Sequence, residues 1–142
     1  MRSEARAASE GDVERAALLL HAAAPGRSRE AYETALRARI TESDGGTLIA
    51  GESTLSWALD GGALFLYDLA GDRDGVESLV ALAERIAHRC LAVVLAATLF
   101  DDDPMLEHLS ALGFAHDWSE AEASGGRVRK LVGLVHPVGE DG

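Results

Sequence analysis

Two adjacent polar residues, Tyr67 and Asp68, stand inside an apolar run and are the first candidates for chemistry in this chain. The run from Ala63 to Leu69 reads ALFLYDL, which is typical of a strand buried on both faces. Because side chains alternate along a strand, we expect Tyr67 and Asp68 to face opposite sides of the sheet. In a cleft, Asp68 would act as a general base or bind an ammonium group, and both residues are candidate catalytic residues. The alternative is a hydrogen-bonded acid at the end of a strand.

The third catalytic candidate is His108, because imidazole exchanges protons near neutral pH. Its neighbour Leu109 lies on the apolar stripe of a predicted helix, so His108 should point about 100 degrees away from that stripe. His116 offers the same chemistry on the far side of the Gly113-Phe114 corner. For either histidine the alternative is an ordinary surface or hydrogen-bonded residue.

The charge of the chain restricts its partners. With 24 acidic and 13 basic residues, the formal net charge is −11. This argues against nucleic acid, which needs a phosphate-facing basic patch, and against an anionic membrane surface. It favours a small cationic amine or a peptide amine. The single cysteine, Cys90, cannot form an internal disulfide, which fits a reducing, cytoplasmic location. No spacing of His, Asp or Glu suggests a metal site.

The length of 142 residues suits one domain, expected over 1–138, with 139–142 as a frayed tail. No apolar run approaches the roughly 20 residues of a membrane helix, and the N-terminus lacks the apolar core of a secretory signal. A homodimer is compatible with the sequence, although nothing in the chain demonstrates one.

Periodicity and turn residues predict that one central mixed sheet positions these candidates, in an α/β (α+β) architecture of order β-α-α-β-β-β-α-β-α-β-β. Strand, helix and strand over 63–69, 74–90 and 91–99 predict two parallel strands joined by a right-handed crossover. The flanking hairpins make the rest of the sheet antiparallel. The remaining strands are expected at 3–8, 47–50, 54–59, 114–123 and 128–135, with a turn at 124–126, and the remaining helices after Ser9, after Ser28 and after Asp101-Asp102-Asp103-Pro104.

This order resembles the GCN5-related N-acetyltransferase (GNAT) family over about residues 4–135. The opening Arg6-Ala7-Ala8 followed by Glu10-Gly11-Asp12-Val13 is similar to the family start R-x-A-x-x-x-D. The strand, loop and helix from 64 to 87 form the second matching stretch. The third ends in Leu112-Gly113-Phe114 and is similar to the family segment Y-x-x-x-G-F.

The resemblance implies that an acetyl group passes from acetyl-CoA to an amine by direct attack, without a covalent intermediate. The pantetheine arm would lie like an added strand beside 64–69, where this strand diverges from 92–99. The pyrophosphate would sit on the N-terminus of the following helix, where free N–H groups and the helix dipole favour an anion. The resemblance assigns cofactor binding to Leu69, Arg73, Gly75, Val76 and Ser78, with backbone N–H groups of the strand polarising the thioester.

Two departures from the family pattern keep a second hypothesis open. Aligned on Gly75, the family loop Q/R-x-x-G-x-G/A places Asp72, Asp74 and Glu77 where a pyrophosphate would dock. Each acid opposes an anion by roughly 1 kcal/mol when exposed, although acids also stabilise a helix start with no ligand present. The family tyrosine that protonates the leaving thiolate is replaced by Leu109. The chain is therefore either an N-acyltransferase or a repurposed GNAT-fold binding protein that no longer uses coenzyme A.

Overall fold

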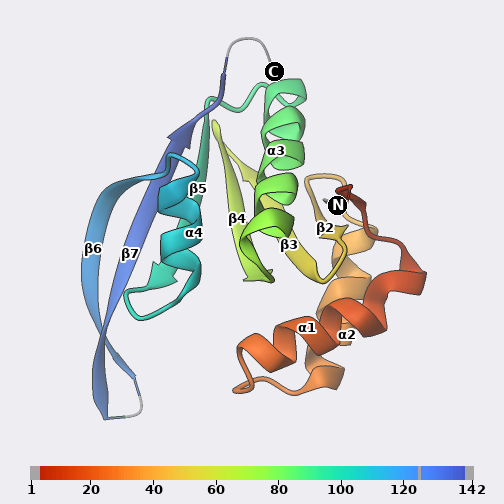
Figure 1. The fold of residues 1–142 in the computed structure, drawn as a ribbon, viewed down its shortest axis with the longest axis horizontal. Helices are drawn as coiled ribbons and strands as arrows, with labels where there is room; N and C mark the ends of the chain where they lie inside the picture. Colours follow the sequence, from red (N-terminus) through yellow and green to blue (C-terminus); the bar gives the residue numbers. More distant parts are fainter. Residues whose placement is uncertain (1–3, 125, 140–142) are drawn as a thin grey trace.

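The computed structural model describes residues 4–124 and 126–139, and over these residues seven strands form one sheet of order β1-β2-β3-β4-β5-β7-β6 (Figure 1). The strands are β1 Arg6–Ala7, β2 Gly45–Ala50, β3 Ser53–Asp60, β4 Ala63–Ala70, β5 Val94–Phe100, β6 Ala115–Ser124 and β7 Arg127–Pro137. The helices are the short 3-10 helix η1 Glu10–Asp12, and α1 Val13–Ala23, α2 Arg29–Ile40, α3 Arg73–Arg89 and α4 Met105–Ala111.

The predicted mixed sheet and its order of helices and strands are confirmed, with shifts at the boundaries. The opening strand has two residues, and β5 begins at Val94 rather than at Leu91. Leu91 has a φ of +62° in the turn after α3 and is 85% exposed. The prediction that the strand begins there failed because this apolar residue is not buried in the sheet. The predicted turn at 124–126 contains Gly125, which lies outside the described residues. In the predicted tail, Gly139 donates a hydrogen bond to Glu84, whereas 140–142 lie outside the described residues.

Helices cover both faces of the sheet. Helices α3 and α4 lie on one face (Figure 1), where Leu64 and Leu66 of β4 join the larger core with Leu79 and Leu109. This core forms because α3 carries an apolar stripe at helical spacing. On the opposite face, α1 and α2 pack against each other and against β2–β4 around a smaller core. Within the described residues, no helix is both long and apolar enough to cross a membrane.

The parallel pair at the centre of the sheet is short. Strands β4 and β5 pair from Ala63↔Val94 to Leu66↔Ala97 and then diverge. On their outer sides both strands remain paired, β4 with β3 as far as Ala70 and β5 with β7 as far as Phe100. The ends of β4 and β5 therefore face each other across a gap.

Candidate functional site

A bulge in β4 begins where that strand leaves β5. Asp68 has a φ of +48°, and the register between β3 and β4 shifts between Thr54 and Ser56. The left-handed conformation is uncommon for a residue with a side chain, and aspartate tolerates it better than most. The expected alternation of Tyr67 and Asp68 is wrong, because the bulge adds a residue and both side chains contact Arg39 on the same face.

Arg39 of α2 organises this face of β4. Its guanidinium lies 2.8 Å from Asp68 Oδ2, donates to Ser56 Oγ at 3.0 Å, and stacks 4.6 Å from the centroid of the Tyr67 ring. Ser56 Oγ in turn lies 2.9 Å from the Thr47 hydroxyl of β2. Burial is the main cause that raises the pKa of Tyr67 above its usual value, so this phenol stays protonated at neutral pH.

Two adjoining cavities open at the gap between β4 and β5. The larger has a volume of about 610 Å³ and the smaller about 250 Å³. Both are bounded by the end of α1, by Leu69, by Phe100 and by Asp103. Tyr67 and Asp68 line the smaller cavity, so the structure brings two of the three catalytic candidates together there.

The third candidate, His108, lines the larger cavity. Its neighbour Leu109 is fully buried in the core, whereas His108 is half-buried. Its Nδ1 atom is buried and has no hydrogen-bond partner among the described residues. A buried imidazole nitrogen without a partner is an available donor or acceptor for a ligand in this cavity. His116 lies on β6 within 3.1 Å of Ser119 and lines neither cavity.

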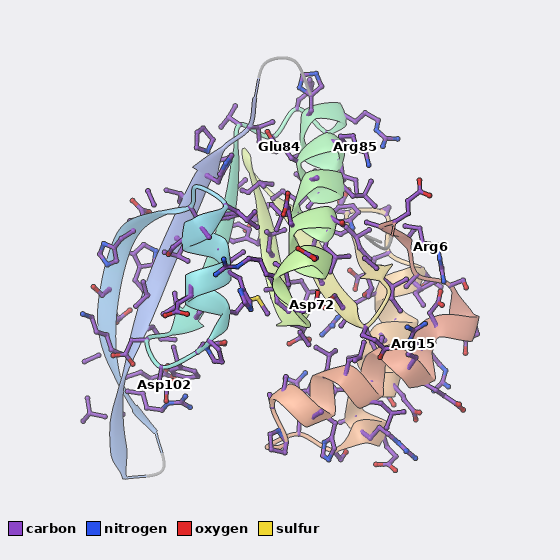
Figure 2. The ribbon with its side chains drawn as sticks, in the orientation of Figure 1. Arg6, Arg15, Asp72, Glu84, Arg85 and Asp102 are labelled. Atoms are coloured by element: carbon purple, nitrogen blue, oxygen red, sulfur yellow. The ribbon has the colours of Figure 1, made fainter. Side chains whose placement is uncertain are left out.

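The start of α3 differs from the expected anion site. Figure 2 shows Asp72 at the first turn of this helix, where its Oδ1 accepts a hydrogen bond of 2.8 Å from the Gly75 amide. The Val76 amide donates to the Asp72 carbonyl at 2.9 Å, and the Val76 side chain is fully buried. The expectation that the Gly75 and Val76 amides are free for a pyrophosphate is therefore wrong, because the side chain and the carbonyl of Asp72, the residue that caps α3, accept these two N–H groups.

The other expected cofactor residues divide into two groups. Leu69 lines both cavities, whereas Arg73 and Ser78 line neither. Arg73 is exposed in the first turn of α3, and Ser78 is half-buried in the body of that helix.

Gly75 has a packing role that the sequence did not reveal. A Cβ at Gly75 or at Gly71 would collide with the side chain of Ser53. Ser53 lies at the start of β3, is 1% exposed, and its hydroxyl has no hydrogen-bond partner among the described residues. Gly71 therefore lets the loop before α3, and Gly75 the first turn of α3, pass directly over the start of β3.

Sequence reasoning missed Arg39, Phe100 and Arg129. The guanidinium of Arg129 lies 3.5 Å from the centroid of the Phe100 ring and 3.1 Å from Asp102, at the wall of the larger cavity. One signal for Arg39 was present, since it follows Tyr32 by seven residues and Leu36 by three on the buried stripe of α2. No local pattern marks Phe100 or Arg129.

Solved acetyltransferase structures share this fold. The ribosomal-protein-alanine N-acetyltransferase of Brucella melitensis matches with a TM-score of 0.74 at 16% identity, over 94% of this chain and 98% of that one. A putative acetyltransferase of Salmonella typhimurium, solved with its cofactor acetyl-CoA, matches with a TM-score of 0.75 at 15% identity, over 96% and 94% of the two chains. A GNAT-family acetyltransferase of Streptococcus pneumoniae matches with a TM-score of 0.69 at 16% identity, over 95% and 98%. No protein-family model and no curated protein matches the sequence.

The sheet order, the parallel β4–β5 pair and these similarities define a mixed α+β domain. Its fold is that of the GNAT acetyltransferases, as the three sequence stretches indicated. At these identities the likeness concerns the fold, and activity has to be argued from the site.

Proposed function

We propose that this protein is an N-acyltransferase that moves an acetyl group from acetyl-CoA to a small amine or a peptide amine. The observation that carries the proposal is the gap between β4 and β5, which opens directly after Leu66↔Ala97. A strand end whose neighbour has departed offers backbone N–H and C=O groups to an extended guest. The pantetheine arm carries amide groups of the kind that pair with such a strand.

The smaller cavity suits the amine. Its described lining contains two carboxylates, Asp68 and Asp103, and no basic side chain, while apolar residues such as Leu20 and Leu131 form much of the rest. Carboxylates in a mostly apolar pocket favour an ammonium group on an apolar body. Because Asp68 is already paired with the Arg39 guanidinium, we assign it to orienting the amine rather than to proton transfer.

The larger cavity suits the thioester and its leaving group. The bound ammonium group first loses one proton to water. The neutral amine then attacks the carbonyl carbon, a C–N bond forms, the C–S bond breaks, and a second proton leaves the nitrogen to water. The thiolate then needs a proton, and His108 lines this cavity with a buried, unpartnered nitrogen. We propose that His108 donates that proton in place of the family tyrosine, whose position Leu109 occupies in the core.

A second candidate function is favoured by Asp72. The Asp72 carboxylate already accepts the hydrogen bond from the Gly75 amide. This is the helix start at which the pyrophosphate of coenzyme A would have to bind. A GNAT-fold protein that binds a cationic ligand and does not use coenzyme A fits this arrangement.

Calorimetric titration with acetyl-CoA separates the two functions. The acyltransferase proposal expects binding, followed by release of free thiol when amines are added. Ala23 lines both cavities, so the larger side chain of Ala23→Trp would fill part of their space and should abolish acetyl-CoA binding. Leu18→Trp on the exposed side of the same helix, where Leu18 is 52% exposed, is the matched control and should bind normally. Absence of binding at millimolar acetyl-CoA would contradict the first function and leave the second.

A further inference from the structure

Arg39 is a buried arginine whose contacts converge on the bulge in β4. It lies in the last turn of α2, and 9% of its surface is exposed. Its two terminal nitrogens reach Ser56 of β3 and Asp68 of β4, while its plane covers the Tyr67 ring. One side chain thus ties α2 to both strands at the point where their register shifts.

The backbone conformation of Asp68 is one that a contact to its side chain can stabilise. Its φ of +48° lies in the left-handed region, which a residue with a side chain occupies when its surroundings hold it there. Among the contacts of the described residues, the ion pair of 2.8 Å with Arg39 is the one that engages the Asp68 carboxylate. Asp68 Oδ2 is buried and accepts no hydrogen bond among these residues, so the attraction is that between the two opposite charges. That pair is largely buried, with 11% of the Arg39 side chain and 23% of the Asp68 side chain exposed.

The bulge also coincides with the start of the gap. Leu66 is the last residue of β4 that pairs with β5, and Asp68 follows two positions later. The backbone turn at Asp68 therefore sets the direction in which Leu69 and Ala70 continue, and Leu69 lines both cavities. A residue that holds the backbone of Asp68 in place therefore also holds Leu69 in place at the wall of both cavities.

We propose that Arg39 is a positioning residue that holds Asp68 in its left-handed conformation and thereby aims the end of β4 at the ligand in the gap. The part of this inference that concerns ligand binding rests on the proposed acyltransferase function. The part that concerns the conformation of Asp68 and the direction of β4 does not, because both are properties of the protein without ligand.

The test compares variants that separate folding from positioning. Arg39→Met removes the guanidinium and leaves the Asp68 carboxylate half-buried without its partner, which threatens the fold itself. Arg39→Met combined with Asp68→Asn leaves no unpaired charge, and asparagine tolerates a positive φ as well as aspartate does. Arg37→Met is the matched control, since Arg37 lies on the same helix and pairs with the exposed Glu10. Arg39→Lys keeps the charge but cannot reach Ser56 and Asp68 together.

Hydrogen exchange of the Leu69 and Ala70 amides gives the readout without ligand. We expect exchange at least tenfold faster in the double variant, an intermediate effect in Arg39→Lys, and no change in Arg37→Met. Calorimetry should show acetyl-CoA binding at least tenfold weaker in the double variant, with Arg37→Met unchanged.

Wild-type exchange at Leu69 and Ala70 in a folded double variant would overturn the inference, whatever happens to binding. Faster exchange together with absence of acetyl-CoA binding by the wild-type protein would support the positioning role and contradict the proposed function. Faster exchange spread evenly over β2 and β3 as well would also overturn it, because the ion pair would then stabilise the sheet generally rather than aim β4.

Discussion

The carboxylate of Asp72 accepts a hydrogen bond of 2.8 Å from the backbone amide of Gly75, and so caps α3 with the protein's own anion. In a GNAT fold this is the helix end at which the resembled family binds pyrophosphate. The cap therefore stabilises the helix, and under the proposed function it would compete with the pyrophosphate of acetyl-CoA for the same N–H group.

Replacing Asp72 should strengthen acetyl-CoA binding. Asp72→Asn keeps a good helix cap and removes one negative charge, which is worth about 1 kcal/mol at an exposed site, or about fivefold in affinity. Asp72→Ala also frees the Gly75 amide and should bind more tightly still, at a cost of about 1 kcal/mol in folding. Calorimetry and urea unfolding measure the two effects. Equal affinity in all three proteins would show that Asp72 does not face the ligand.

Enlarging Gly75 should destabilise the protein whether or not ligand binds. The new methyl group of Gly75→Ala would collide with Ser53, which is held in the sheet, so a loss of about 1–3 kcal/mol is expected. Adding Ser53→Gly in the same chain should recover much of it. Gly26→Ala is the control, since a Cβ there meets nothing within 4 Å. If Gly75→Ala unfolds at the wild-type urea concentration, the close approach described above is incorrect.

His108→Gln should lower turnover more than binding. A lost proton donor typically reduces kcat by about 10²–10⁴-fold, while the KM for acetyl-CoA changes little because the side chain keeps its size. His116→Gln serves as the control on β6, away from both cavities. Steady-state release of free thiol is the measurement. An unchanged kcat would assign proton delivery to another group or to water.

Stability at low pH should depend on Asp12. Two hydrogen bonds from Arg6, at 2.7 and 2.8 Å, are the largest cause that holds the pKa of Asp12 well below its usual value, followed by the amide of Ser9. Since the folded pKa lies below the unfolded value of about 4, the stabilisation is complete above that pH and is lost as the pH falls.

Asp12→Asn should therefore be less stable than wild type at pH 7, and the difference should narrow steadily between about pH 5 and pH 2. Urea unfolding across that range is the measurement. Asp102→Asn is the control, because the Asp102–Arg129 pair is single, 3.1 Å long and 72% exposed at the carboxylate. A constant difference between wild type and Asp12→Asn at all pH values would contradict this prediction.

The sheet was predictable because its signals are local. Apolar runs, helical stripes and glycine turns mark each element, and the strand-helix-strand unit dictates the parallel β4–β5 pair. The bulge at Asp68 was not predictable, since strand alternation favours the opposite result and the left-handed turn depends on Arg39, 29 positions earlier in the chain. The Asp72 cap was predictable, because an aspartate at the N-cap of a helix commonly accepts a hydrogen bond from the backbone N–H two or three residues later. That rule predicts that the Gly75 amide is already bonded within the protein.

The shortness of the β4–β5 junction has a mechanical consequence. Four residue pairs join the β1–β4 half of the sheet to the β5–β7 half, and α3 bridges the junction by contacting β3, β4 and β5 (Figure 1). Under load, the domain should part first along this seam into two lobes. A ligand that forms bonds with the ends of both β4 and β5 would act as a cross-link between the two halves. The ligand-bound protein should therefore withstand a higher pulling force than the protein without ligand.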